Sequence, residues 1–338
     1  VYHKENEGLA KGRDYAIKHS KTKYILPLDA DDLIEPTYIE TLYWTMEINK
    51  EASWAFTNSV GFGKYIYLVD HKFDSEKMKT ENQITATALI RKDKILNLSG
   101  YGVAKRYVNE DWHLWLRMLA EGDYPVQVTY YGFWYRRRMQ SLLTEVNDTK
   151  KKENELRLRD LKIEADKITK RVEPVIYSEE KTEDLLQYNE LNFDKTFPKE
   201  NKETILYILP QIGCDAKLYK QIKEKNNKFN IIVITLEKTE YSEYVYRQKY
   251  EKFATVFNLT TFLPSKYYLG FIEYIIKTRN INEIYMAKNK YSQIIQGKFK
   301  IMDNITYRNS KFVYILKILE YKLNHTIIVR AIRKAIRL

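Results

Sequence analysis

The sequence predicts an α/β protein built of two main units, and three observations support this fold class. The chain has 338 residues, about twice the length of an average domain. Its hydrophobic fraction of 44% is spread along the whole chain, which suits packed cores and argues against a disordered protein. Amphipathic helices alternate with short apolar strands in both halves, as in proteins whose helices cover a mainly parallel sheet.

Composition argues against several classes of protein. The single cysteine, Cys214, cannot form an internal disulfide or supply a four-ligand zinc site, so we expect a protein from a reducing compartment. No run of about 18 apolar residues occurs, which argues against a transmembrane helix. The formal net charge of +12 suggests nucleic-acid binding, but the basic residues are interleaved with acids or lie near the end of the chain. We therefore expect no nucleic-acid partner.

Residues 1–145 form the first predicted unit. Residues 6–20 have the spacing of an amphipathic helix, residues 24–28 (YILPL) are typical of a short buried strand, and residues 35–46 predict a second helix. The acidic residues Asp29, Asp31 and Asp32 lie between this strand and the second helix. Because open α/β sheets bind ligands at the carboxyl ends of their strands, these acids are a candidate site.

The three aspartates support two interpretations. Alternate residues of an extended segment share a face, so Asp29 and Asp31 can hold one hard divalent cation that also binds phosphate oxygens. Equally, the aspartates can form a polar turn, bonding to their own backbone and capping the next helix. Their spacing alone favours neither interpretation.

A second acidic pair opens the helix predicted to start near residue 110. The apolar stripe of this helix consists of Trp112, Trp115, Leu116 and Leu119. This stripe places Glu110 and Asp111 in the first turn of the helix. A structural explanation is that Asn109 caps the helix and that the two acids interact with its dipole. The functional alternative is a carboxylate that faces a cleft and acts as general base on a hydroxyl.

Three arginines, Arg136, Arg137 and Arg138, follow an aromatic strand predicted at residues 132–135. A guanidinium binds phosphate through two parallel hydrogen bonds, so these side chains are candidates for contact with a diphosphate. A solvated basic edge explains them equally well.

Residues 146–203 are expected to form a charged helical linker. Residues 148–171 are dense in charge and contain no glycine or proline. One narrow apolar stripe runs along this helix, through Leu158, Leu161, Ala165, Ile168 and Val172. The helix therefore either docks on a neighbouring unit or links two units.

Residues 204–300 predict a small Rossmann-like unit around a parallel sheet. Its strands are expected from residue 204, from residue 230 and near residue 284, with helices at 216–224 and 270–278. Residues 301–338 are expected to form basic amphipathic helices, because five Lys or Arg and no acid follow Glu320. This tail either packs on the second unit or lies on an anionic membrane surface.

In their order along the chain, the motifs of the first unit resemble the family 2 glycosyltransferases of the GT-A fold. The likeness covers nearly all of residues 1–141. The matching segments are NEGLAKGR (6–13), YILPLDADD (24–32) with the DXD signature, TALIRKDKILNLSGY (87–101), EDWHLWLR (110–117) and the pair Tyr135-Arg136.

The resemblance implies roles for these residues. Asp31 would bind Mn²⁺ or Mg²⁺, and Asp29 would contact the cation and the donor's ribose or diphosphate. Asp111 would deprotonate the acceptor hydroxyl for attack with inversion, and Glu110 would support the acceptor or the base. The donor side would be completed by Asn6, Gly8, Arg13 and Arg138. The implied partners are a nucleotide-sugar donor and a saccharide or lipid-linked acceptor.

The chain departs from this family in two places. The family's first strand, which ends in P-x-Y-N, and the acids that hold the nucleotide base would precede Asn6, so we expect the chain to lack the first strands of the domain. Arg138 stands where many members have a histidine that helps to bind metal.

Residues 204–291 resemble the amino-terminal half of a GT-B glycosyltransferase of the family 4 type. Cys214 stands where a second glycine is usual, and the half that binds the nucleotide sugar in GT-B enzymes does not follow. The resemblance therefore implies an acceptor-side or packing module without its own activity.

Together these expectations describe an inverting, metal-dependent hexosyltransferase that builds a cell-surface polysaccharide or an envelope glycoconjugate. The alternative is a noncatalytic scaffold or acceptor-binding module derived from such an enzyme. We expect a cytoplasmic protein, either free or peripheral on the inner face of the cell membrane.

Overall fold

The computed structural model describes most of both predicted units. It covers residues 2–101, 109–139, 151–177, 193–213, 216–237, 242–279, 281–287, 305–307 and 313–317. The chain forms two compact units, which we call unit 1 (Val1–Thr182) and unit 2 (Glu183–Leu338). Among the described residues, no helix has the length and hydropathy needed to cross a bilayer.

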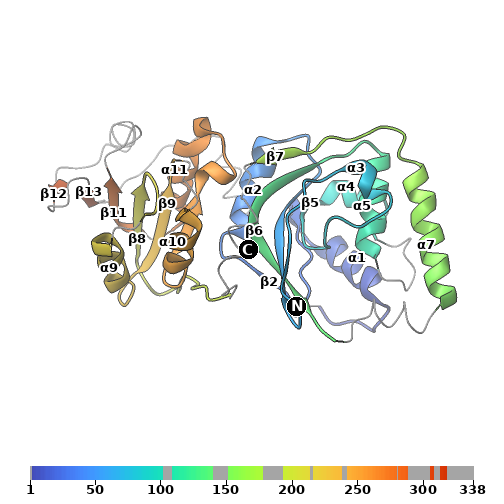
Figure 1. The fold of residues 1–338 in the computed structure, drawn as a ribbon, viewed down its shortest axis with the longest axis horizontal. Helices are drawn as coiled ribbons and strands as arrows, with labels where there is room; N and C mark the ends of the chain where they lie inside the picture. Colours follow the sequence, from blue (N-terminus) through green and yellow to red (C-terminus); the bar gives the residue numbers. More distant parts are fainter. Residues whose placement is uncertain are drawn as a thin grey trace. The chain divides into compact units, whose positions relative to one another are not determined.

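Unit 1 is built around a mixed sheet (Figure 1). The main strand order is β1-β5-β3-β6-β2, with β4 paired to β3 and β7 to β6. The strands are β1 (Tyr24–Ile25), β2 (Leu33–Ile34), β3 (Trp54–Gly63), β4 (Tyr67–Val69), β5 (Leu89–Arg91), β6 (Pro125–Arg137) and β7 (Val175–Tyr177). The long strands β3 and β6 run parallel from the Trp54–Pro125 pair to the Gly63–Arg137 pair, with register shifts around Asn58.

Helices pack around this sheet (Figure 1). They are α1 (Leu9–His19), α2 (Tyr38–Ile48), α3 (Ser75–Met78), α4 (Lys92–Asn97), α5 (Glu110–Ala120) and α7 (Lys151–Asp166). The apolar stripe predicted for the helix at residue 110 is confirmed, because all four of its members are buried. Trp115 of α5 stacks on Trp54 of β3 with 5.3 Å between ring centroids, which places α5 firmly against the sheet.

Helix α7 docks on unit 1 through the predicted stripe. Leu161, Ala165 and Ile168 are 4 to 5% exposed and belong to the same core as α5, while Leu158 remains 49% exposed. The chain then forms β7, which pairs parallel to β6. Residues 151–177 therefore belong to unit 1, so of the two alternatives for the charged segment over residues 146–203, docking on a neighbouring unit fits this part and a free linker does not. The buried side of the stripe is wide enough to hold a highly charged helix on the core.

Unit 2 has the parallel sheet expected of a Rossmann-like unit, in the order β10-β9-β8-β11-β13-β12. Its strands are β8 (Thr204–Leu209), β9 (Asn230–Thr235), β10 (Thr255–Asn258), β11 (Ile281–Ala287), β12 (Ile305–Tyr307) and β13 (Val313–Lys317). Its helices are α9 (Ala216–Lys225), α10 (Ser242–Glu251) and α11 (Tyr268–Thr278), with short 3-10 turns η1 (Leu259–Thr261) and η2 (Ser265–Tyr267). The first four strands of this order are parallel.

The last two strands correct one expectation. We predicted helices over residues 301–338, but β13 pairs antiparallel with β11, and β12 pairs with β13. The sequence of β13, VYILK, is rich in β-branched and aromatic residues, which pack well on a sheet. Cys214 lies outside the described residues, and so does the basic tail that follows Glu320.

Candidate functional site

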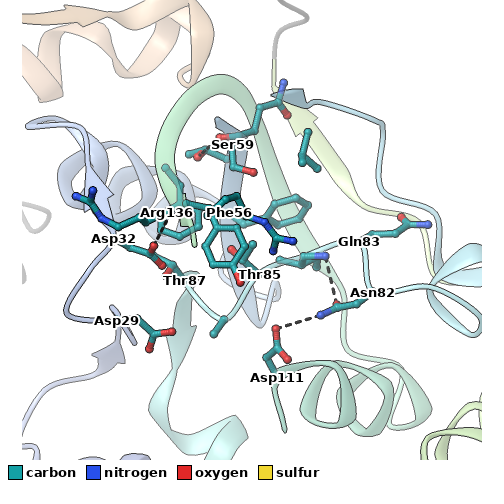
Figure 2. A pocket seen from close by; sticks show the side chains of 18 of the residues that line it. Asp29, Asp32, Phe56, Ser59, Asn82, Gln83, Thr85, Thr87, Asp111 and Arg136 are labelled. Atoms are coloured by element: carbon teal, nitrogen blue, oxygen red, sulfur yellow. Dashed lines mark hydrogen bonds between the residues drawn. The ribbon is translucent and has the colours of Figure 1, made fainter. Parts of the chain in front are cut away.

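A cavity of about 620 Å³ lies in unit 1, a volume typical of small-molecule sites. It brings together four segments that are far apart in the sequence (Figure 2). These are the acidic turn after β1, residues 82–87 before β5, the start of α5 and the end of β6. Most of the predicted site residues line it, namely Arg13, Asp29, Asp31, Glu110, Asp111 and Arg138.

Pairing between β2 and β6 joins the acidic turn to the arginines. Leu33 pairs with Trp134, so the turn that precedes β2 lies beside the end of β6. The Arg136 Nε donates to the carbonyl oxygen of Asp31 at 2.7 Å, and Arg138 Nη2 lies 3.0 Å from Asp31 Oδ2. Two candidate sites that we considered separately therefore form one.

Asp32 differs from its two neighbours because it is buried. Its Oδ1 accepts a hydrogen bond of 2.8 Å from the backbone N–H of Arg136. Burial, together with the charges of Asp31 and Asp29, raises the pKa of Asp32 to about 7, although the hydrogen bond from Arg136 opposes this shift. The Asp32 side chain therefore holds the turn against β6. It does not bond to the backbone of its own turn, and it does not cap α2, whose cap residue is Thr37 and has no side-chain cap bond.

Arg13 of α1 bridges the two acidic segments. Its Nη2 lies 2.9 Å from Asp29 Oδ1, its Nη1 pairs with Glu110 Oε1, and its guanidinium lies 5.4 Å from the ring centroid of Tyr101. The Arg13 side chain is only 10% exposed. We expected Arg13 on the donor side, and the structure places it between the acidic turn and α5, where it balances charge on both.

The two carboxylates at the start of α5 have different surroundings. Burial and the neighbouring charge of Asp111 raise the pKa of Glu110 to about 7, against the opposing effect of Arg13. Burial also raises the pKa of Asp111, although hydrogen bonds, including one from Asn82, lower it. Asn82 Nδ2 donates to Asp111 Oδ2 at 3.1 Å. A raised pKa makes an ionised carboxylate a stronger proton acceptor.

Asn109 is not the side-chain cap that we expected. It adopts a left-handed backbone conformation with φ of 66° and makes no side-chain cap bond to α5. Its Oδ1 instead accepts a hydrogen bond from Arg157 of α7. The acids of the first turn are therefore not accompanied by the usual cap.

Two residues expected on the donor side, Asn6 and Gly8, are not among the residues that line the cavity. Asn6 Oδ1 accepts from the backbone N–H of Gly8 at 3.0 Å, and both residues are exposed. Gly8 has a φ of 92° and directly precedes α1, a conformation that favours glycine. These residues shape the start of the helix that carries Arg13.

Several residues that line the cavity were not predicted from the sequence. The most informative are the buried polar side chains of the long strands, Asn58 and Gln127, whose amides bond at 3.2 Å. Polar residues in the middle of an otherwise apolar strand were a usable signal, since such groups are rarely buried without a reason. Asn82 carried no comparable signal, because it lies in an irregular polar segment.

The acidic turn suits a hard divalent cation. Asp29 and Asp31 line the cavity with partly exposed carboxylates, and Arg138, the partner of Asp31, is 61% exposed, so this pairing is readily exchanged. No cluster of three or more His, Cys, Asp or Glu side chains able to hold a metal occurs in the described ranges. A cation at this turn would therefore take its other ligands from phosphate oxygens and water.

Comparison with known proteins agrees with this geometry. Residues 1–108 match the glycosyl transferase family 2 model. The chain is also 26% identical over 143 residues to a protein of Methanocaldococcus jannaschii named uncharacterized glycosyltransferase MJ1057. That alignment covers 38% of this chain and 46% of the relative, so the chain spans about half the length of the relative it matches. Unit 1 is therefore similar to the family 2 glycosyltransferases over residues 1–108.

Proposed function

We propose that the protein is an inverting, metal-dependent transferase that moves a sugar from a nucleotide-sugar donor to a hydroxyl of a polysaccharide or envelope glycoconjugate. One observation carries this proposal: the acidic turn with its arginines and the carboxylates of α5 face the same cavity. One side thus offers groups for a diphosphate, and the other offers a proton acceptor.

The donor side would be formed by Asp29, Asp31 and Arg138. The two carboxylates would hold Mn²⁺ or Mg²⁺, and the bound cation would offset the charge that grows on the leaving nucleoside diphosphate. Arg138 lies at the same edge, where its guanidinium can bind a phosphate oxygen.

Asp111 would act as the general base on the acceptor side. It takes the proton of the acceptor hydroxyl while that oxygen forms a bond to the anomeric carbon. The bond from the anomeric carbon to the diphosphate oxygen breaks, and the nucleoside diphosphate leaves with both bonding electrons. Glu110 is less suited to this role because it is paired with Arg13. We therefore assign Glu110 to supporting the base.

The test uses the full chain with Mn²⁺ and a panel of UDP- and GDP-sugars, measuring release of nucleoside diphosphate. Asp111→Asn should lower turnover by about 10² to 10⁴-fold, the usual contribution of a general base. Asp31→Asn should lower both turnover and Mn²⁺ binding measured by calorimetry. Asp160→Asn, on the exposed side of α7, is the matched control and should change neither. Full turnover in Asp111→Asn would refute the assignment of the base.

The alternative of a noncatalytic scaffold makes a different prediction in the same calorimeter. If the chain releases no heat with nucleoside diphosphate and Mn²⁺, the scaffold is favoured. For unit 2 we propose an acceptor-side or packing role, supported by the parallel pairing of strands β8 to β11 and by the sequence resemblance described for residues 204–291. We also propose a cytoplasmic location, and liposome co-sedimentation with and without residues 321–338 would test peripheral membrane contact.

A further inference from the structure

Asn82 is held in a defined orientation beside Asp111 (Figure 2). Its side-chain nitrogen donates to Asp111 Oδ2 at 3.1 Å, and its side-chain oxygen accepts from the backbone N–H of Ile84 at 3.4 Å. The second bond uses the oxygen of the amide, so the nitrogen is the atom that faces the carboxylate. Asn82 thus presents a donor, rather than an acceptor, to Asp111.

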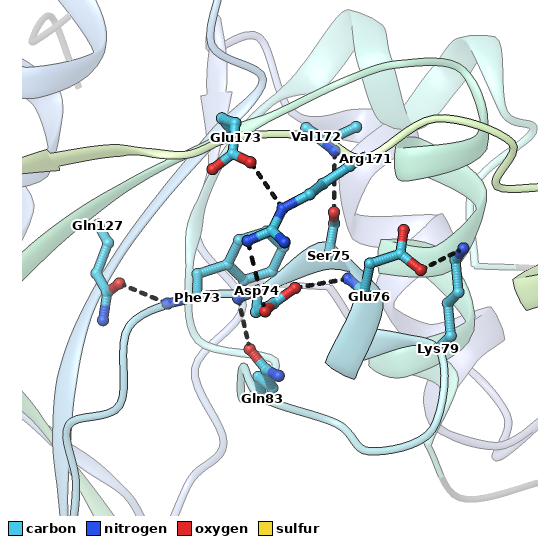
Figure 3. Close-up of polar contacts among 10 residues, drawn as sticks. All are labelled: Phe73, Asp74, Ser75, Glu76, Lys79, Gln83, Gln127, Arg171, Val172 and Glu173. Atoms are coloured by element: carbon cyan, nitrogen blue, oxygen red, sulfur yellow. Dashed lines mark hydrogen bonds and ion pairs between the residues drawn. The ribbon is translucent and has the colours of Figure 1, made fainter.

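The segment that carries Asn82 is tied to itself and to the sheet. Residues 73–83 contain one short helix, α3, and are otherwise irregular. The backbone N–H of Asp74 donates to Gln83 Oε1 at 2.9 Å, which closes the segment into a loop (Figure 3). The backbone N–H of Phe73 donates to Gln127 Oε1 at 3.0 Å, which fixes one end of this loop to β6.

Residues 171–173, which follow α7, also contact this loop (Figure 3). The backbone N–H of Val172 donates to Ser75 Oγ at 2.9 Å. Arg171 Nη2 lies 3.6 Å from Asp74 Oδ2, and Arg171 Nε lies 2.7 Å from Glu173 Oε1. Residues 171–173 lie beyond residues 1–108, the part of the chain that matches the family model. They therefore add a support that the family match does not describe.

We propose that Asn82 is a positioning residue for Asp111 and that residues 171–173 hold its loop in place. This inference rests on the proposed function, in which Asp111 accepts the proton of the acceptor. Ordering an irregular loop costs conformational entropy at every residue, so a loop that must place one amide accurately needs contacts of this kind.

The surroundings of Asp111 predict how the loss of Asn82 affects the base. Within the described part of the chain, the ionisable groups that face this carboxylate are Glu110 on the same helix, Arg13 on α1, Tyr101, and Tyr135 on β6. The hydrogen bond from Asn82 lowers the pKa of Asp111 against the effect of burial. Without this bond the pKa rises, and Asp111 becomes a competent base only at higher pH.

The support by residues 171–173 is tested without substrate, by hydrogen–deuterium exchange of the full chain read by mass spectrometry. Ser75→Ala and Arg171→Ala should speed exchange in peptides covering residues 73–87 at least fivefold and leave α2 unchanged. Arg159→Ala is the matched control, since Arg159 lies on α7, is 67% exposed and faces only Asp160 at 3.9 Å among the ion pairs of the described residues. Unchanged exchange in both test variants would overturn this part of the inference.

The role of Asn82 is tested with the nucleotide sugar that the wild-type chain turns over. In Asn82→Ala we expect kcat to fall about 10 to 100-fold, because small misplacements of a reacting group have effects of this size. The acid limb of the pH profile should move to higher pH by about one unit, and the donor KM should stay within twofold. Asn82→Asp, which keeps the shape but replaces the donor with a second carboxylate, should move the limb further.

The outcomes separate this inference from the proposed function. If Asp111→Asn abolishes turnover while both Asn82 variants keep the wild-type pH profile and kcat, the base assignment stands and the positioning role is wrong. A fall in kcat with an unmoved acid limb would mean that Asn82 only stabilises the fold, which also overturns the role. If the wild-type chain shows no turnover, the proposed function fails and the positioning role fails with it.

Discussion

The bridge made by Arg13 leads to a prediction about stability. Arg13→Met keeps the apolar stem of the side chain and removes the charge that pairs with Glu110 and Asp29. Of these partners the Glu110 side chain is 6% exposed and the Asp29 side chain is 43% exposed, so the main loss comes from Glu110. Removing one partner of a buried ion pair costs about 3 to 5 kcal/mol, because the other charge stays buried without compensation. We expect about 3 kcal/mol at pH 8.

The same variant should show a dependence on pH. The pKa of Glu110 is raised from 4.5 to about 7 in the folded protein, so its contribution to stability falls as the pH rises through this range. Without Arg13 the pKa of Glu110 rises further, and the loss continues to higher pH. At pH 5 Glu110 is protonated in both folded proteins, so the difference between them should shrink to about 1 kcal/mol.

Urea unfolding followed by tryptophan fluorescence measures this effect. All five tryptophans lie in unit 1, so the signal reports this unit and not unit 2. Lys11→Met, which removes an exposed cation from the same helix, is the control and should leave the midpoint unchanged. Adding Glu110→Gln to Arg13→Met should restore most of the loss at pH 8. A loss below about 1 kcal/mol at pH 8, or an equal loss at pH 5 and pH 8, would refute the reasoning.

Three further predictions concern docking, backbone and metal binding. Leu161→Ala should destabilise unit 1 by about 2 to 5 kcal/mol in the same unfolding assay, whereas Leu158→Ala on the exposed side of α7 should cost under about 0.5 kcal/mol; equal effects would show that α7 does not dock on the core. Gly100→Ala should lower stability more than Gly122→Ala, because both glycines have φ near 80° but only the first would bring a Cβ within 2.2 Å of a carboxylate oxygen. If circular dichroism melts show equal shifts for both glycines, that contact is relieved without cost. Arg138→Ala should tighten Mn²⁺ binding about threefold in calorimetry, because it removes a cation that pairs with the acidic turn; unchanged or weaker binding would mean that this pairing does not compete with the metal.

Local patterns predicted much of the secondary structure. The helix expected at residues 6–20 is α1, the helix expected at 270–278 is α11, and the strand expected from residue 230 is β9. These elements depend on the spacing of apolar residues within one segment, and this spacing can be read directly from the sequence. The antiparallel strand β13 was missed because it depends on β11, a partner about 30 residues away.

The candidate site was predicted only in part, because the sequence shows the chemistry of its residues but not which distant segments come together. The chemical character of Asp31, Asp111 and Arg138 is a property of the residue types and was visible in the sequence. Their common cavity was not, because it depends on the register of β2 on β6 and on the packing of α1 against α5. Asn82 shows the limit most clearly, since nothing in its local sequence connects it with Asp111.

By itself, the sequence determined most of the helices and strands of unit 1 and of the first part of unit 2, and which side chains have the chemistry for binding a diphosphate and accepting a proton. Only the tertiary structure decided how these side chains are paired: Arg13 between Glu110 and Asp29, Arg138 on Asp31, and Asn82 on Asp111. The physical reason is that apolar periodicity acts over one or two turns of a helix or a few residues of a strand. Ion pairs and hydrogen bonds between distant segments form only after sheet pairing and core packing have fixed the distances between them.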